Sequence, residues 1–364
     1  MDLTTRPPAT DIIDQPGSVR QGEELDVARV DAYLKGIEPG LTGTPELHQY
    51  PGGASNLTYL LRYPGQDLIL RRPPFGHKAK SAHDMVREAR IMHGLRPAYP
   101  YIPRIVAICE DEAVLGAQFY VMERLHGIIP RQDFPPSLAL DPERTSRLCR
   151  NFFDKLIELH QVDYQAAGLG WIGKGEGYVQ RQITGWNDRY RKARTPDQPD
   201  CEAIMAWLAA KMPARDTAIC VIHNDYRLDN VVLDSADPLR IIGVLDWEMA
   251  TLGDPLMDLG STLAYWIQAD DEPLYQDMRR QPSNAPGMLT RQEVLEYYSA
   301  KTGWSVASFD FYLIYGLFRL AAIGQQIYYR YYHGQTKVAQ YAAFKETVPY
   351  LAARCERLIA ESRL

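Results

Sequence analysis

The chain has 364 residues, of which 46% are hydrophobic and 24% are charged, and its formal net charge is -6. This composition is typical of a globular protein, and the length allows a large core divided into two lobes. The negative charge argues against nucleic acid as a partner, and no apolar run is long enough to cross a membrane.

The N-terminal region and the cysteines bear on the cellular compartment. The five cysteines are scattered, with no CxxC pair and no metal-ligand spacing. Their odd number favours reduced thiols in a cytoplasmic protein over a disulfide framework. The first residues lack the apolar core of a signal peptide, and we expect a flexible, Pro-rich tail over 1–22. Whether the chain forms a homodimer stays open.

Short β-rich runs and helical patterns alternate in the first third of the chain. A helix is expected over 25–34, and a Gly-containing turn separates two β-rich runs within 50–62. This turn on its own is equally well a plain hairpin. Residues 67–72 are expected to form a strand that ends in Arg71 and Arg72.

The next helix carries a carboxylate at the border of its apolar face. Helical spacing over 81–95 places Met85, Ala89 and Met92 on one face, and Glu88 lies beside them. A carboxylate at this place needs a cation, for which Arg71 is the natural candidate, although a solvated helix charge is the alternative. Two further strands are expected over 102–110 and 118–123.

Helical patterns dominate the remainder of the chain. A helix capped by Asp141 is predicted to continue to Leu159. Five glycines between 168 and 177 break the regularity before a basic and aromatic stretch that runs to 192. Further helices are expected over 201–212, 293–301 and 311–330.

The segment 219–259 contains the candidate catalytic and metal-binding residues. Its sequence is ICVIHNDYRLDNVVLDSADPLRIIGVLDWEMATLGDPLMDL. Two β-rich runs flank a turn at Pro238, and Asn230 and Asp246 lie equal distances before and after it. An antiparallel hairpin would therefore bring these two side chains together. Such oxygen ligands suit Mg²⁺, and Asp225 would point into the same space.

Each of these residues also has an ordinary structural interpretation. Asp225 could cap a turn, Asn230 could hold an Asx-turn, and Asp246 could begin a loop. We interpret His223 as a structural hydrogen-bonding residue rather than a base, and Asp254 as a helix N-cap before a proline. The combined spacing of the first three favours a phosphoryl-transfer site.

The pattern His223-x-Asp225-x-x-x-x-Asn230, followed by Asp246, resembles the catalytic and metal-binding segments of protein kinases. The form HNDYRLDN…VLDWE…GDPLMDL is similar to the small-molecule branch, the aminoglycoside phosphotransferase and choline kinase-like family. It is closer still to the phosphotransferase domains fused to acyl-CoA dehydrogenases. The resemblance covers most of the chain from about Tyr50 onward.

This resemblance implies an α+β, protein-kinase-like fold with two lobes. The N-terminal nucleotide-binding lobe, over 23–124, would contain an antiparallel sheet plus a helix. The C-terminal catalytic and substrate-binding lobe, over 125–364, would be mainly helical with a catalytic β-hairpin. ATP and Mg²⁺ are the implied cofactors.

The resemblance also implies how the nucleotide is held. The loop with Gly53, Ser55 and Asn56 would lie over the phosphates. Arg71 takes the position of the phosphate-binding lysine, which is a departure from the family, although arginine also binds phosphate oxygens. Arg72 is the alternative.

The remaining nucleotide contacts come from the helix and from the junction of the lobes. Glu88 would fix the phosphate-binding arginine. Met122 would border the adenine pocket, and the backbone at Glu123 and Leu125 would bond the base edge.

The implied reaction is transfer of the γ-phosphoryl group of ATP to a hydroxyl of a small molecule. Asp225 would accept or orient the acceptor proton, and Asn230 and Asp246 would ligate Mg²⁺. Arg227 would neutralise charge on the transferring group.

The charge pattern bears on the acceptor. An aminoglycoside is a polycation and requires carboxylates around it, but the acidic run 270–272 reads as a solvated loop. Basic groups beside aromatics favour an anionic hydroxy metabolite, and the resemblance to domains fused with acyl-CoA dehydrogenases implies a hydroxyacyl-CoA. The alternatives are an aminoglycoside O-phosphotransferase and a nucleotide-binding pseudokinase without catalysis, and a protein acceptor is disfavoured because no activation segment follows. The basic groups are Arg181, Arg189, Arg191, Lys192, Arg319 and Arg330.

Overall fold

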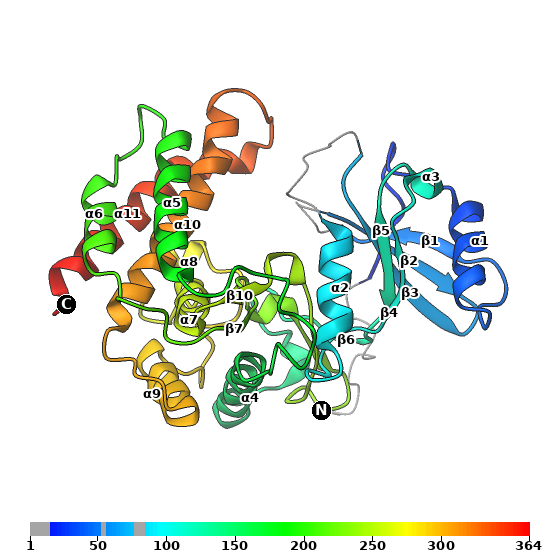
Figure 1. The fold of residues 1–364 in the computed structure, drawn as a ribbon, viewed down its shortest axis with the longest axis horizontal. Coiled ribbons are helices and arrows are strands. Elements are labelled where there is room, and N and C mark those ends of the chain that lie inside the picture. The colour runs from blue at the N-terminus through cyan, green and yellow to red at the C-terminus, as the bar shows by residue number, and fades with distance from the viewer. Residues whose placement is uncertain (1–14, 52–55, 76–83) are drawn as a thin grey trace, which may run out of the picture.

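The computed structural model describes residues 15–51, 56–75 and 84–364. An antiparallel sheet with flanking helices is followed by a mainly helical part (Figure 1). This confirms the predicted α+β, two-lobed fold. Within the described ranges, no helix is long and apolar enough to cross a membrane.

The N-terminal sheet has five strands in the order β1-β2-β3-β5-β4, and all neighbours are antiparallel. The turn predicted at Gly53 and Ser55 lies outside the described part of the chain, between β1 and β2 in the sequence. The strands are β1 (Glu46–Gln49), β2 (Leu57–Tyr63), β3 (Gln66–Arg72), β4 (Ile105–Cys109) and β5 (Phe119–Glu123).

The two faces of this sheet pack against different helices. Leu68 and Leu70 of β3 pack with helix α1 (Val27–Ile37), whereas Ile69 packs in the core that includes helix α2 (Met85–Leu95). Because successive strand residues point to opposite faces, Arg71 shares the face of Ile69 and Arg72 shares that of Leu70. The side chains of Arg71 and Arg72 therefore point to opposite faces of the sheet.

Helix α2 begins after the predicted start near Ser81. The side chain of Asp84 accepts a hydrogen bond from the Arg87 amide at 2.8 Å and caps the first turn. Helix α2 buries the apolar face predicted for it, and Glu88 is buried with that face at 1% exposure. A short helix, α3 (Glu112–Leu115), lies between β4 and β5 and was not predicted, because four residues are too few to show a helical period.

Eight helices of the described chain form most of the C-terminal part. Asp141 caps the first of them with a proline at its first position, as predicted. Three of the helices, α5, α8 and α11, were not predicted, and for α5 the glycines before it obscure its period. The helices are α4 (Pro142–His160), α5 (Tyr178–Ala193), α6 (Glu202–Ala210), α7 (Pro255–Ala264), α8 (Pro273–Asp277), α9 (Arg291–Thr302), α10 (Phe309–Tyr332) and α11 (Phe344–Glu361).

Two small antiparallel sheets lie among these helices. One sheet has the order β6-β8-β9, and the other pairs β7 with β10. Of these strands β6 and β10 were not predicted. The strands are β6 (Gly127–Ile128), β7 (Cys220–Ile222), β8 (Val231–Asp234), β9 (Ile241–Val244) and β10 (Thr251–Gly253).

Helices α7 and α10 approach closely at two glycines. A Cβ atom on Gly260 would overlap the Tyr312 carbonyl, and one on Gly316 would overlap the Gly260 carbonyl. The absence of side chains at this crossing lets α10 lie directly against α7. This contact holds α10 beside the segment that follows β7.

Two surface expectations need revision. The acidic run is a solvated loop only in part: Asp270 and Glu272 are exposed, but Asp271 pairs with Arg291 and Arg354 and its side chain is only 7% exposed. The arginines belong to α9 and α11, which are distant in sequence. Of the predicted tail over 1–22, residues 15–22 are described, and Gly17 exchanges two backbone hydrogen bonds with Gln49. The prediction of a flexible tail therefore stays untested for the residues before Gly17.

Candidate active site

The hairpin of β8 and β9 brings Asn230 and Asp246 to one end. The Leu245 amide donates to the Asn230 carbonyl at 2.8 Å, so Asp246 is the next residue beyond the last pair. A register shift at Leu233 moves the pairing by one residue from the symmetric arrangement around the turn. The predicted proximity is nevertheless present.

Asp225 lies directly beside Asn230. Asp225 Oδ1 accepts a hydrogen bond from Arg227 Nη1 at 2.7 Å, and Oδ2 accepts one from Asn230 Nδ2 at 3.2 Å. Asn230 Nδ2 also donates to the Asp225 carbonyl at 2.8 Å. The amide nitrogen of Asn230 is thereby committed, which leaves its side-chain oxygen to face a cation.

Arg227 lies between two carboxylates. Its Nε lies 2.8 Å from Asp229 Oδ1, and its guanidinium carbon lies 4.9 Å from the centroid of the Tyr265 ring. Burial opposes its charge, but the carboxylates of Asp225 and Asp229 raise the pKa of Arg227. Arg227 therefore compensates the charge of Asp225 in this structure.

The residue before the candidate base, Asn224, is held from four sides. Its φ of +64° is unusual for a residue other than glycine. Its amide donates to Asp258 Oδ1 at 2.7 Å, and its carbonyl accepts from Arg319 Nη2 at 2.9 Å. Its side chain accepts from the Tyr178 hydroxyl and donates to the Met249 carbonyl, both at 3.0 Å. These contacts fix the backbone that presents the candidate base.

Asp258 accepts hydrogen bonds from the loop that contains His223 and Asn224. It is fully buried, and Oδ2 accepts hydrogen bonds from the His223 amide at 2.8 Å and from His160 Nε2 at 3.1 Å. Although burial opposes it, the hydrogen bond from His160 keeps the pKa of Asp258 below its ordinary value. His223 Nε2 contacts the Leu245 carbonyl at 3.0 Å, which agrees with a structural role for this histidine.

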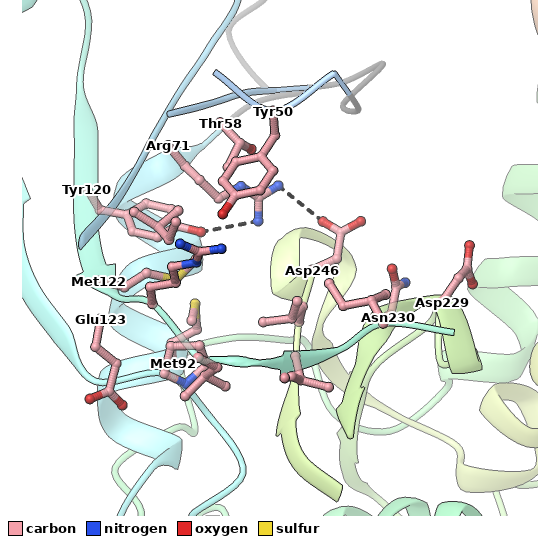
Figure 2. Close-up of a pocket in the computed structure, with 18 of the residues that line it drawn as sticks. Tyr50, Thr58, Arg71, Met92, Tyr120, Met122, Glu123, Asp229, Asn230 and Asp246 are labelled. Carbon is pink, nitrogen blue, oxygen red and sulfur yellow. Dashed lines mark hydrogen bonds and ion pairs between the residues drawn. The ribbon is translucent and has the colours of Figure 1, made fainter. Parts of the chain in front are cut away.

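Arg71 connects the sheet to the catalytic segments (Figure 2). Its Nη1 lies 2.6 Å from Glu88 Oε1 and 3.2 Å from the Tyr120 hydroxyl, and its Nη2 lies 3.3 Å from Asp246 Oδ1. Arg72 instead stacks on a phenylalanine ring, with its guanidinium carbon 3.6 Å from the ring centroid. Of the two arginines, Arg71 therefore faces the candidate metal ligand.

A second carboxylate, that of Glu248, lies two residues after Asp246 and was not predicted as a site residue. Burial and the neighbouring carboxylates of Asp246 and Glu88 raise the pKa of Glu248 to about 7, although Arg71 opposes this shift. Asn56 Nδ2 donates to Glu248 Oε2 at 2.8 Å. Asn56 of the predicted nucleotide loop thus contacts the segment that follows Asp246. The Asp-Trp-Glu sequence was the signal that could have identified Glu248.

A cavity of about 590 Å³ lies between the N-terminal sheet and the hairpin (Figure 2). This volume is in the range of small-molecule pockets. Neither Asp225 nor Glu88 lines it, since the first lies beside Asn230 and the second is covered by Arg71. The apolar lining includes Ile69, Met92, Met122, Leu125, Val232 and Leu245, and the charged end includes Arg71, Asp229, Asn230 and Asp246.

The predicted adenine-binding residues Met122, Glu123 and Leu125 all line this cavity. The Glu123 amide donates to the Arg104 carbonyl at 2.9 Å and is thus already used. The Leu125 backbone makes no hydrogen bond to another residue of the described chain. Leu125 therefore has both backbone groups open to a ligand.

The metal-ligand set is small. In the described part of the chain, no group of three or more His, Cys, Asp or Glu side chains is arranged to hold a metal ion. Asn230 and Asp246 offer one amide oxygen and one carboxylate. Such a set fits Mg²⁺, which usually takes one or two protein ligands and completes its shell with water and phosphate oxygens.

Comparison with known sequences agrees with this geometry. The phosphotransferase enzyme family matches residues 46–294. Acyl-CoA dehydrogenase family member 10 of Mus musculus is 35% identical over 325 residues, which are 88% of this chain and 30% of that protein. Family member 11 of Gallus gallus is 31% identical over 353 residues, which are 93% of this chain and 44% of that protein. The chain thus spans less than half the length of these curated relatives.

Solved structures give the same result. A candidate aminoglycoside phosphotransferase from Ralstonia eutropha matches with a TM-score of 0.80 and 29% identity, over 94% of this chain and 100% of that chain. An aminoglycoside phosphotransferase in ternary complex with AMP-PNP and hygromycin B matches with a TM-score of 0.56 and 13% identity, over 92% and 98%. The second likeness shows the fold alone. The predicted family resemblance is confirmed.

Proposed function

The chain belongs to the phosphotransferase enzyme family, and we propose that it transfers the γ-phosphoryl group of ATP to a hydroxyl of an anionic small molecule. The observation that carries the proposal is the meeting of Asn230 and Asp246 at the charged end of a cavity that Arg71 also lines, with Asp225 hydrogen-bonded to Asn230 just outside its lining. We assign nucleotide binding to the lobe over 23–124, and catalysis and acceptor binding to the lobe over 125–364.

The cavity suits a nucleotide in both shape and polarity. Apolar side chains such as Met122 would cover the adenine ring, and the open backbone groups of Leu125 would bond its edge. Arg71, held by Glu88 at 2.6 Å, would donate to the α- and β-phosphate oxygens. These roles need no rearrangement of the sheet.

The loop and the hairpin would complete the phosphate site. We propose that Gly53, Ser55 and Asn56 cover the phosphates and that Asn230 and Asp246 ligate Mg²⁺. When bound, Mg²⁺ supplies positive charge against the phosphate oxygens. Burial and the carboxylates of Asp246 and Glu88 together raise the pKa of Glu248, and a cation at this place would relieve the repulsion between the carboxylates.

Asp225 would orient the acceptor hydroxyl and take its proton. As the acceptor oxygen bonds to the γ-phosphorus, the bond from that phosphorus to the β–γ bridging oxygen breaks, and ADP leaves with this oxygen. Arg227, 2.7 Å from Asp225, would hold this carboxylate in place and add positive charge near the transferred group. No bond to the protein forms, so the rate gain comes from positioning and electrostatics.

The surroundings of the base favour a negatively charged acceptor. The buried guanidinium of Arg319 contacts the residue next to Asp225, and the acidic run at Asp271 is neutralised by arginines. The similarity to acyl-CoA dehydrogenase family members supports a hydroxyacyl-CoA as the acceptor. An aminoglycoside remains the second candidate, because the Ralstonia eutropha relative is described as a candidate aminoglycoside phosphotransferase.

A side-by-side kinase assay tests this proposal. The purified protein is incubated with γ-labelled ATP, Mg²⁺ and either a hydroxyacyl-CoA or a kanamycin-type aminoglycoside. We expect label in the hydroxyacyl-CoA and the higher kcat/KM for it. A higher kcat/KM for the aminoglycoside would contradict the charge argument. Transfer to neither compound, nor to any component of a metabolite extract, would favour a nucleotide-binding pseudokinase.

A further inference from the structure

Arg319 in α10 is a buried cation that forms no ion pair with a carboxylate of the described chain. It is 5% exposed, and its Nη2 donates to the Asn224 carbonyl at 2.9 Å. Burial opposes its charge, but the Tyr315 phenol and the Asp225 carboxylate raise the pKa of Arg319. A guanidinium carries five N–H donors, so most of its hydrogen-bonding capacity is left beside the candidate base.

A second guanidinium, that of Arg189 in α5, lies at the same indole ring. The guanidinium carbons of Arg189 and Arg319 lie 4.4 and 5.4 Å from the centroid of the Trp186 ring. Arg189 forms no ion pair within the part of the chain that the structure describes, whereas Arg191 on the same helix pairs with Glu202 at 2.7 Å. Arg189 is exposed and Arg319 is buried, and both guanidinium groups lie at one indole ring. An anion that contacted both would be bound by two positive charges.

Tyr315 adds an unused hydroxyl at this place. Tyr315 precedes Arg319 by four residues, so the two side chains lie on one face of α10. It is 1% exposed, and its hydroxyl makes no hydrogen bond of regular geometry with a described residue. Burial raises the pKa of Tyr315 to about 12, and the Arg319 and Arg189 charges and the Trp186 indole oppose this shift. The hydroxyl is therefore buried without a regular hydrogen bond among the described residues, which is costly.

We propose that Arg319, Arg189 and Tyr315 form a subsite for an anionic group of the acceptor, a carboxylate or a phosphate. The guanidinium groups would bind its oxygens as charged forks, and the Tyr315 hydroxyl would donate a further bond. Because Arg319 contacts the residue before Asp225, the bound anion and the hydroxyl that is phosphorylated belong to one molecule. The inference rests on the proposed function, since it specifies how that acceptor is held.

A binding experiment tests the subsite without relying on turnover. The free acid 3-hydroxybutyrate and its CoA thioester are titrated into wild type, Arg189→Gln, Arg319→Lys and Tyr315→Phe, with Arg191→Gln as a control from the same helix. We expect Arg189→Gln and Tyr315→Phe to weaken binding by about tenfold, the scale of one charge-assisted or buried hydrogen bond. Arg319→Lys keeps the charge but loses the fork and should also weaken binding. Arg191→Gln should leave it unchanged.

The two compounds identify the source of the anion. A loss confined to 3-hydroxybutyrate assigns the subsite to a carboxylate, and a loss confined to the thioester assigns it to a CoA phosphate. Equal affinity in Arg189→Gln and Arg191→Gln would contradict the proposed subsite. A wild-type protein that binds neither compound would contradict it as well.

A separate titration with Mg-AMP-PNP keeps the two proposals apart. We expect all four variants to bind this nucleotide as wild type does. A wild-type protein that binds the anions but not Mg-AMP-PNP would contradict the phosphotransferase proposal and leave the subsite in place.

Discussion

Arg71 Nη1 lies 2.6 Å from Glu88 Oε1, and this ion pair joins strand β3 to helix α2 behind the cavity. The Glu88 side chain is only 1% exposed and that of Arg71 13%. A buried carboxylate is strongly unfavourable without a cation, so the pair fixes the helix against the sheet. The same guanidinium reaches Asp246 at 3.3 Å and so relates the sheet to the hairpin.

Removing the arginine alone should destabilise the fold. Arg71→Ala leaves Glu88 buried without a partner, and we expect a loss of about 3–5 kcal/mol in the free energy of unfolding. The double variant Arg71→Ala/Glu88→Gln removes the charge as well and should recover most of this loss. Denaturant unfolding measures both. Equal destabilisation in the single and double variants would show that the pair is not the source of the effect.

The two adjacent arginines should differ in nucleotide binding. In the background of Glu88→Gln, Arg71→Ala should weaken Mg-ATP binding by about tenfold or more, because a charged donor to phosphate is lost. Arg72→Ala should leave the affinity unchanged, because Arg72 stacks on Phe75 and does not line the cavity. The reverse pattern would assign the phosphate contact to Arg72.

The pKa of Glu248 predicts a pH dependence in metal-free buffer. Burial, Asp246 and Glu88 raise this pKa from the ordinary 4.5 to about 7. The neutral form is therefore favoured by folding, and its contribution is complete below 4.5 and is lost as the pH rises through about 7. Glu248→Gln, which keeps the hydrogen bond from Asn56, should flatten the fall in Tm between about pH 5 and pH 8.

A matched carboxylate provides the control for this titration. Glu346→Gln removes an exposed acid from the start of α11, and the pH profile of Tm should stay that of wild type. An unchanged profile in Glu248→Gln would contradict the assignment of the raised pKa to Glu248.

Loss of the proposed metal ligand should act through Mg²⁺. Asp246→Ala removes a carboxylate from the hard-cation site, so Mg²⁺ should no longer strengthen nucleotide binding. Isothermal titration with ATP in the presence and absence of Mg²⁺ gives the comparison, and circular dichroism checks that the fold survives. A Mg²⁺ effect equal to that of wild type would place the metal on other residues.

The fold was predictable where the local signals were strong. The apolar run of β3, the Asp141 cap and the turn at Pro238 each indicate one element by themselves. The hairpin then places Asn230 near Asp246, although the register shift between Val232 and Leu233, which the sequence does not indicate, sets Asn230 opposite Leu245. Helix α5 was missed because its N-cap is a glycine and the glycines before it interrupt the helical period.

Other features depend on contacts that leave no local trace. The Arg87 guanidinium in α2 donates to the Ile172 and Ala250 carbonyls at 3.0 and 2.6 Å, and backbone acceptors carry no sequence signal. The raised pKa of Glu248 requires carboxylates from two other segments to meet it. Arg191 pairs with Glu202, whereas Arg189 lies over the Trp186 ring. This difference between two arginines of one helix is likewise not visible in the sequence.

The turnover of Asp225→Asn tests the central claim most directly. The substitution preserves size and the hydrogen bond from Arg227, and Asp237→Asn in the β8–β9 turn is the control. With hydroxyacyl-CoA as acceptor and saturating Mg-ATP, we predict that Asp225→Asn lowers kcat by about a hundredfold or more, the scale of general-base catalysis. Its Kd for Mg-ATP should match that of wild type. A kcat close to that of wild type would contradict the role of Asp225 and the proposed reaction site.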